Sequence, residues 1–336
     1  MEVRNYHPAD PPLPGLLQDP QQFRWRQVDH PEATTSPRVV VALDQGRVAG
    51  VASAQRQALV FDRIKTSGAL LGPRQSTGQE SLDRGLLDLL STRLADEGAA
   101  VLLAAIEPAE LPFFETAGFR YLGEASARNL YIGLEAVSAR LSKTALSPLR
   151  RFAQEARRIR PKLVEVELDS ILSEIFSRLS SEGDRQGLAL FKSPAYWTWR
   201  YKNDPHHHHR TLVYRQKAGG PIDAFAIVRR HDSDRGRAVL HLMDYWTRQP
   251  GRRAHAKLLG DLAILAMTES IDVLRCFAMA GSSTEQAMLG LGCIRKKVER
   301  VVVVRSLDPE SAELPSPYPA KDAGLVAGDL DLYNVL

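Results

Sequence analysis

The sequence has 336 residues, of which 44% are hydrophobic and 25% charged, and its formal net charge is +4 at pH 7. This length suits two ordinary domains of a soluble protein. The mild positive charge favours anionic ligands such as phosphorylated cofactors, and it excludes the strongly basic class of DNA-binding proteins. No run reaches the roughly 20 apolar residues that cross a bilayer, and the first residues lack the apolar segment of a secretory signal. Cys276 and Cys293 stand in apolar surroundings and imply no disulfide framework, so we expect a cytoplasmic protein.

Residues 1–140 predict a first domain of strands and helices in a defined order. Two short apolar runs on either side of the turn at residues 44–46 indicate a β-hairpin, and another strand-like run follows at 64–71. Leucines at helical spacing then predict an amphipathic helix that ends near Gly98. A buried strand at 99–106 and a short helix within 113–119 complete the order.

Residues 141–162 separate this domain from the rest of the chain and are predicted to form a basic linker helix. Arg150, Arg151, Arg157, Arg158, Arg160 and Lys162 lie in this segment, with few acidic residues. Such a run of charge is usually a solvated helix face. The alternative is a patch for an acidic partner, such as a carrier protein or a membrane surface.

Residues 163–308 repeat the first domain. Trp199, Arg200 and Pro205 reproduce the spacing of an earlier Trp, Arg and Pro, at positions 25, 26 and 31. Hairpin, strand, helix, strand and short helix then follow in the same order, so we infer a duplicated domain. Each copy is expected to form a mixed sheet of its own, and a single sheet running through both halves would contradict this organisation. Residues 309–336 are expected to form an irregular tail.

Four consecutive histidines, residues 206–209, are the feature that most resembles a metal site. Consecutive residues of a loop cannot all point at one ion, and no Cys or Asp cluster accompanies them. We therefore predict no metal, and we expect this loop to line an acceptor cleft. Trp25 and Trp199 are expected to be packing residues.

Two segments of the first copy resemble the GNAT acyltransferase superfamily. The stretch GALLGPRQSTGQESLDRGLL, residues 68–87, resembles its strand-to-helix loop for acyl-CoA, in which Gly follows Gln or Arg by three residues. The stretch LPFFETAGFRYLG, residues 111–123, resembles a later segment with an aromatic pair before Gly-Phe. The Trp-Arg element of each copy is similar to that of two-lobed bacterial GNAT proteins. The resemblance implies an α/β fold of two GNAT-like lobes, each a mostly antiparallel twisted sheet with helices on both faces.

The resemblance also implies where acetyl-CoA, or another acyl-CoA, binds. Backbone N–H groups at a helix start attract a pyrophosphate, Gly permits its close approach, and the pantetheine arm pairs with a splayed strand edge. Glu80 and Arg253 depart from the small residue expected at this point of the loop, and the better preserved loop favours the first copy. The matching residues are Leu71, Arg74, Gln75, Ser76, Thr77 and Gly78 in the first copy, and Arg248, Gly251 and Arg252 in the second.

Acylation of an amine needs a base for the acceptor proton and a donor for the departing thiolate. Asp244, a carboxylate within an apolar strand, is the predicted base, and Glu107 is its counterpart in the first copy. A structural ion pair and a helix cap are the respective alternatives. His241 is expected on the opposite face of the Asp244 strand. The superfamily often places an acidic Tyr in the aromatic pair, which here lacks one, so Tyr245 or Tyr121 is the substitute, unless the thiolate leaves unassisted.

These features together predict an N-acyltransferase that moves an acyl group, expected to be acetyl, from acyl-CoA to a primary amine of a small molecule or sugar. One alternative is a FemAB-like transferase of aminoacyl or long-chain acyl groups with a tRNA-bound or carrier-bound donor. Another is a protein of the same fold that binds CoA without turnover. The sequence leaves the acceptor and the acyl chain length open.

Overall fold

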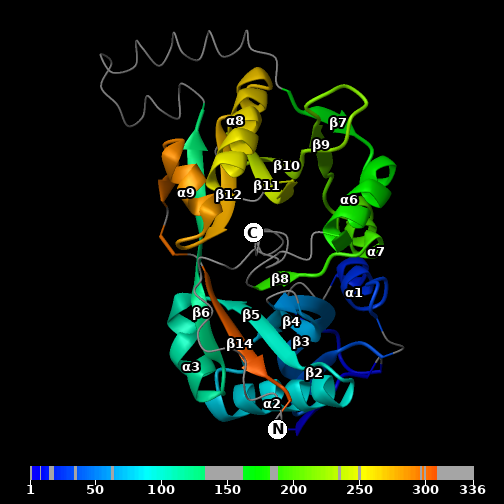
Figure 1. The fold of residues 1–336 in the computed structure, drawn as a ribbon. Helices are drawn as coiled ribbons and strands as arrows, with labels where there is room; N and C mark the ends of the chain where they lie inside the picture. The colour runs from blue at the N-terminus through cyan, green and yellow to red at the C-terminus, as the bar shows by residue number, and fades with distance from the viewer. Residues whose placement is uncertain are drawn as a thin grey trace.

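The computed structural model describes most of the chain (Figure 1). The described residues are 2–7, 9–14, 19–33, 36–61, 64–132, 162–181, 188–233, 236–248, 251–295, 297–298 and 300–308. Apart from Lys162, the predicted linker lies outside the described residues, and so does the predicted tail. Within the described ranges, no helix combines the length and apolar character that a membrane span requires.

The N-terminal half, residues 2–132, begins with a strand and a short helix. Asp19 caps this helix by accepting a hydrogen bond from the N–H of Gln21, and Pro20 occupies a first-turn position whose N–H needs no partner. The elements of this half are β1 (Glu2–Asn5), α1 (Pro20–Gln27), β2 (Val39–Asp44), β3 (Arg47–Phe61), β4 (Ile64–Gln75), α2 (Glu80–Asp96), β5 (Val101–Ile106), the 3-10 turn η2 (Pro108–Glu110), α3 (Leu111–Thr116) and β6 (Arg120–Tyr131).

The C-terminal half, residues 162–308, repeats this order after an additional helix and strand within residues 169–190, and it confirms the predicted succession from the hairpin onward. The Ser193 hydroxyl accepts a hydrogen bond from the N–H of Tyr196, and Pro194 follows Ser193. The cap of the helix that precedes Trp25 is therefore repeated before Trp199. The elements are β7 (Val164–Val166), α6 (Asp169–Ser181), β8 (Leu188–Leu190), α7 (Pro194–Trp197), the π-helical turn η3 (Thr198–Lys202), β9 (Arg210–Tyr214), β10 (Ala224–Asp232), β11 (Ala238–Thr247), α8 (Arg252–Thr268), β12 (Val273–Met279), α9 (Ser283–Gly290), β13 (Ile294–Arg295) and β14 (Arg300–Ser306).

The described strands form one mixed sheet of 14 strands, so the expectation of a separate sheet in each copy is wrong. The order is β1-β2-β3-β4-β5-β14-β6-β12-β11-β10-β9-β7, with β13 on β6 and β8 on β3. The pairs β4–β5 and β11–β12 are parallel, and the other pairs are antiparallel. The predicted mixed α/β class is confirmed, with helices on both faces of the sheet.

The halves share a sheet because they exchange their last strands. β14, the last described strand of the chain, lies between β5 and β6 of the N-terminal half. β6 begins beside β14 and continues into the C-terminal half, where residues 125–131 pair with β12. Ala125 marks the junction, since it lies opposite both Met279 and Arg300. Each half is therefore completed by the other.

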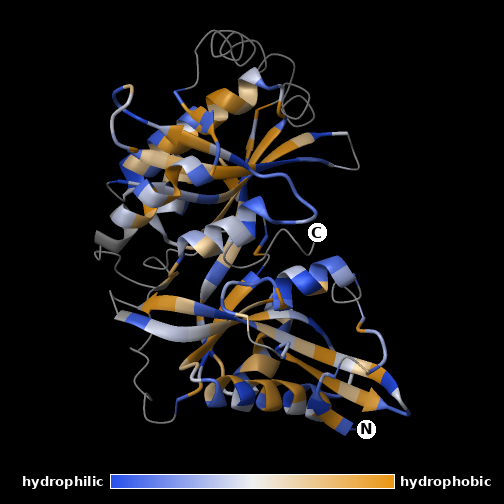
Figure 2. Cartoon of the chain, turned by 90° about the vertical axis from the view of Figure 1, so that its right-hand side faces the viewer, coloured by the Kyte–Doolittle hydropathy of each residue, from blue (hydrophilic) through white to orange (hydrophobic). Residues whose placement is uncertain are grey.

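Helices cover the two faces of the sheet differently. On the outer face, α2 and α3 pack over the N-terminal half and α8 and α9 over the C-terminal half, each pair on its own apolar cluster. The inner face carries α1, α6, α7 and η3 over a core to which both halves contribute. Figure 2 shows mostly hydrophobic strands and helices with one hydrophobic and one hydrophilic side.

Trp25 and Trp199, 174 positions apart, meet in this inner core. The indole N–H of Trp25 donates to the carbonyl oxygen of Trp199 at 3.0 Å, and the indole N–H of Trp199 donates to the carbonyl oxygen of Trp25 at 2.8 Å. The rings stack with centroids 4.9 Å apart. Reciprocal contacts between equivalent residues indicate a two-fold relation between the copies. The predicted packing role of both tryptophans is confirmed.

Candidate functional site

Each half has an opening in the sheet where its parallel strands separate. In the N-terminal half, β4 and β5 pair at Gly68–Val101, Ala69–Leu102 and Leu70–Leu103 and then diverge. In the C-terminal half, pairing of β11 with β12 ends at Leu242 and Cys276. A register shift in the pairing with β3 or β10 accompanies each divergence. The extra residue lies on β4 or β11 and bends that strand away from its parallel partner. We name these features the N-terminal opening and the C-terminal opening.

Both openings face the middle of the long sheet. The end of β5 lies beside the start of β14, because Ile106 is opposite Val301. The end of β12 lies beside the middle of β6, because Met279 is opposite Ala125. Since β14 and β6 are themselves paired around Ala125, the two openings point toward each other from opposite halves.

The N-terminal opening exposes the edge of its strand. Residues 70–74 of β4, which include Leu71, are all partly exposed. Arg74 forms an ion pair with Glu110, and its guanidinium carbon lies 4.9 Å from the ring centroid of Phe114. This ion pair spans the opening from the end of β4 to the turn after β5.

The predicted phosphate loop of this half makes its hydrogen bonds internally. The N–H of Thr77 donates to the Asp83 carboxylate at 2.7 Å, and the N–H of Gly78 donates to the Ser76 hydroxyl at 3.0 Å. Ser76 also donates to Asp83. Gln75 is exposed at the end of β4, and Gly78 has a positive φ of 78° with no atom near its missing side chain. An anion in this loop must therefore displace the carboxylate of Asp83.

In contrast to the N-terminal opening, the C-terminal opening is filled by side chains. Every residue of β11 is buried except Tyr245, which is partly exposed. The Tyr245 hydroxyl hydrogen-bonds to that of Thr284 at the start of α9, and its ring packs edge-on against His255 with centroids 5.3 Å apart. His255 also lies within 3.2 Å of the Ser283 hydroxyl, so α8, α9 and β11 are joined across this opening.

Asp244 lies on the inner face in a buried ion pair. Its carboxylate accepts from Lys192 at 2.6 Å, from the Tyr201 hydroxyl at 2.9 Å and from the N–H of Tyr245 at 2.8 Å. Only 1% of Asp244 is exposed. These contacts suit the structural alternative for Asp244, since a base must reach the acceptor amine.

The expectation that His241 lies on the opposite face from Asp244 is wrong. Asp244 is opposite Ile227 and His241 is opposite Arg229, and these two partners lie on one face because they are two residues apart. The strand has an extra residue, Met243, at a β-bulge, which reverses the alternation. Burial lowers the pKa of His241 to about 2, so it is neutral near pH 7.

The three predicted catalytic residues do not come together. Tyr245 points to the outer face of the strand that carries Asp244 on the inner face. Glu107 belongs to the other half, where its N–H donates to Glu110 at 3.0 Å at the start of η2. The Glu107 carboxylate is largely exposed and lies 3.6 Å from Arg300. Tyr121 is 44% exposed on β6.

The loop with four histidines contains a local polar cluster. The Asp204 carboxylate accepts from the N–H of His206 at 3.0 Å and lies 3.1 Å from Nδ1 of His207. It is also 3.4 Å from Nε2 of His209, whose pKa burial lowers to about 3. Among the described residues, no group of three or more His, Cys, Asp or Glu side chains is arranged to hold a metal ion.

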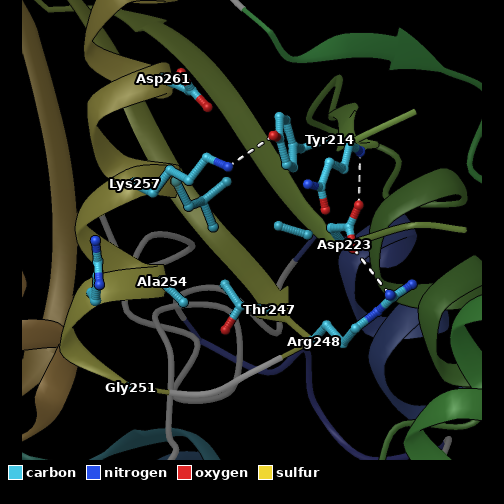
Figure 3. Close-up of a pocket in the computed structure, with 12 residues that line it drawn as sticks. Tyr214, Asp223, Thr247, Arg248, Gly251, Ala254, Lys257 and Asp261 are labelled. Carbon is cyan, nitrogen blue, oxygen red and sulfur yellow. Dashed lines mark hydrogen bonds and ion pairs between the residues drawn. The ribbon is translucent and has the colours of Figure 1, made fainter. Parts of the chain in front are cut away.

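A cavity of about 700 Å³ lies beside the start of α8, bounded by the ends of β9, β10 and β11 (Figure 3). Arg248 pairs with Asp223 at 3.2 Å, and Lys257 donates to the Tyr214 hydroxyl at 2.8 Å. Gly251 precedes α8 and offers no side-chain cap, and the first turn carries no acidic residue, in contrast to α2. Arg252 is exposed at this helix start. We name this cavity the α8 pocket.

Sequence reasoning missed Lys192 and Tyr201, the partners of Asp244. They lie in the segment between β8 and β9, whose place over the inner face no spacing reveals. The repeated caps, Asp19 before Pro20 and Ser193 before Pro194, were a readable signal of where the helix before each Trp-Arg pair begins.

Comparison with solved structures identifies this architecture. An N-myristoyltransferase from Saccharomyces cerevisiae with bound myristoyl-CoA matches with a TM-score of 0.61 and 12% identity, over 91% of this chain and 80% of that one. A GCN5-related N-acetyltransferase from Anabaena variabilis matches with a TM-score of 0.55 and 11% identity, over 81% of this chain. This chain has the GNAT fold. It spans 63% of the Anabaena protein, less than two thirds of its length.

The GNAT likeness concerns the fold alone, because the sequence identities are 11% and 12%. A scan of the sequence against protein families and curated proteins gives no match. The predicted resemblance to the GNAT superfamily is confirmed at the level of fold, and the openings described above occupy the strands that the resemblance assigned to acyl-CoA.

Proposed function

We propose that this GNAT-fold protein is an acyl-CoA-dependent N-acyltransferase that binds its donor in the N-terminal opening. The observation that supports this most is the contrast between the two openings. Residues 70–74 of β4 are partly exposed beside a Gly-containing helix start, whereas the equivalent part of β11 is buried. A pantetheine arm needs an accessible strand edge to pair with.

Arg74 has the charge and position to hold the donor's pyrophosphate. Its guanidinium lies at the end of the exposed edge and is neutralised by Glu110. A pyrophosphate is a stronger partner for a guanidinium than one carboxylate, because it offers more acceptor oxygens and more charge. Binding would release Asp83 from the N–H of Thr77 and replace it with a phosphate oxygen at the start of α2.

Transfer then needs the acceptor amine to lose a proton as it attacks the thioester carbonyl. The nitrogen–carbon bond forms, the carbon–sulfur bond breaks, and CoA leaves as the thiolate or thiol. Glu107 is the better base for a donor in this opening, because its carboxylate is exposed just beyond β5. The alternative bases and acids, Asp244 and Tyr245, belong to the other opening. The acyl group is proposed to be acetyl, and the buried free cysteines suit a reducing compartment such as the cytoplasm.

Calorimetric titration with acetyl-CoA tests the donor site. We expect Arg74→Ala to weaken binding at least tenfold, since it removes a charge-assisted contact. Arg230→Ala is the control, because among the described residues Arg230 pairs with its neighbour Asp232 on an exposed strand end. If Arg252→Ala weakens binding while Arg74→Ala does not, the donor lies in the C-terminal half. If neither acetyl-CoA nor myristoyl-CoA binds, the proposed function is rejected.

A second candidate is a protein that binds CoA without turnover. The bond from Thr77 to Asp83 and the absence of Tyr from the aromatic pair at 113–114 favour it. Release of the CoA thiol with a panel of amines separates the two candidates. Binding without thiol release for any amine would support the non-catalytic one.

A further inference from the structure

The α8 pocket plays no part in the proposed donor site, yet it holds two opposite charges that form no direct ion pair with each other. Lys257 and Asp261 are four residues apart on α8, a spacing that allows a helical ion pair. Lys257 instead donates to Tyr214, and its ammonium lies 4.1 Å from that ring's centroid. Within the described part of the chain, Asp261 has no ion pair within 4 Å, although the charges of Lys162 and Lys257 both act on its carboxyl. Figure 3 shows both side chains extending from α8 toward the side of the pocket that Tyr214 forms.

The other charges of the pocket are nearly balanced. Arg248 and Asp223 pair with each other at 3.2 Å, and Asp223 also accepts from the N–H of Gln216 at 2.7 Å. Arg253 lines the pocket one turn before Lys257 and adds positive charge at that end. The pocket therefore has a positive end at the start of α8 and a negative end at Asp261.

We propose that the α8 pocket binds a small zwitterionic amine, with its acidic group at Lys257 and Arg253 and its ammonium at Asp261. A ligand with one charge would leave the other pocket charge unpaired, whereas a zwitterion pairs both. Ala254 and Leu258 lie on the same flank of the helix and give an apolar floor for the carbons between the two charged groups.

The helix fixes the length of this ligand. Four residues advance about 6 Å along an α-helix, so the charges of the ligand should be separated by about 5–7 Å. An ω-amino acid of four or five carbons fits this separation, and an α-amino acid is too short. Burial raises the pKa of the Asp261 carboxyl against the opposing charges of Lys162 and Lys257, and a ligand ammonium beside the carboxylate would lower it.

The experiment is calorimetric titration of the full chain at pH 7 with γ-aminobutyrate and 5-aminovalerate, without any acyl donor. Glycine tests the length, and butylamine and butyrate each present one of the two charges. We expect the two ω-amino acids to bind at least tenfold more tightly than these three compounds. Asp261→Asn and Lys257→Met should each weaken binding at least tenfold, because each removes one charged contact. Arg84→Met on α2, which removes an exposed pair with Glu80, should change nothing.

Equal binding of butylamine and γ-aminobutyrate would overturn the proposal, and so would binding that both pocket variants leave unchanged. Absence of binding by the ω-amino acids would also overturn it. Thermal unfolding of each variant shows whether it is folded, and the two substitutions act on opposite ends of the ligand, so one folded variant is sufficient. The donor is absent, so the result is independent of the proposed acyl transfer, which the Arg74 titration tests separately.

Discussion

The reciprocal hydrogen bonds of Trp25 and Trp199 predict that the two residues contribute equally to stability. In Trp25→Phe the aromatic ring remains, but the buried carbonyl oxygen of Trp199 loses its indole donor, and Trp199→Phe does the same to Trp25. An unsatisfied buried acceptor costs about 1–3 kcal/mol, and the smaller ring adds a packing defect, so we expect each variant to lose about 2–4 kcal/mol. With an unfolding entropy of about 2.1 cal/mol/K per residue, the midpoint of thermal unfolding should fall by about 3–6 °C.

Trp197 provides the matched control in the same core. It is 3% exposed, and among the described residues its indole nitrogen has no hydrogen-bond partner. Trp197→Phe therefore makes the same change of ring without breaking a hydrogen bond. It should lower the free energy of unfolding by at least 1 kcal/mol less than Trp25→Phe or Trp199→Phe does. Differential scanning calorimetry of the three variants measures this. A loss for Trp197→Phe as large as the others, or unequal losses for Trp25→Phe and Trp199→Phe, would refute the reasoning.

Three further predictions concern buried ionisable side chains. Glu285→Gln removes the Glu285 charge from the ion pair with the fully buried Arg128 of β6. It should cost about 3–5 kcal/mol in urea denaturation, most of it recovered by also replacing Arg128 with Met. Burial lowers the pKa values of His30 and His209 to about 3, so between pH 6.5 and pH 3 the unfolded state binds more protons than the folded state. The free energy of unfolding, measured by denaturation across this range, should be highest above pH 6.5 and fall by up to about 1.4 kcal/mol per pH unit for each histidine toward pH 3. Lys192→Met should destabilise the fold by about 3–5 kcal/mol at pH 7 because Asp244 is buried, and lost activity at unchanged stability would instead favour Asp244 as the base.

The order of elements was predictable because each copy carries local signals of its own. Apolar runs, turn residues and leucine spacing depend only on neighbouring residues and on which face is buried. The exchange of β14 was not predictable, since residues 300–306 form the same apolar strand whether they pair with their own copy or with the other. The pattern of apolar residues predicts the strands, but it does not determine whether they form one sheet or two.

The site was predictable to the level of its loops and not to the level of its contacts. Gly72 and Pro73 in β4 were readable signs of the irregular pairing beside the N-terminal opening. The bulge at Met243 has no such sign in the sequence, so His241 was predicted on the wrong face of β11. Asp244 was correctly singled out as an unusual carboxylate in an apolar strand, but its partner Lys192 is 52 positions away and becomes apparent only in the folded chain.

The two halves differ most at equivalent positions around the starts of α2 and α8. In the N-terminal half, Gly50 lets the side chains of Thr77 and Leu86 pack closely against β3, which closes the space beneath α2. In the C-terminal half, the space beside the start of α8 is open as the α8 pocket, which Gly251 lines. Asp83 turns back onto the N-terminal loop, whereas the first turn of α8 carries no acidic residue. A duplication that began with two identical openings can divide its work in this way: one half keeps an accessible strand edge, and the other fills that edge and gains a pocket on the far flank of the same helix.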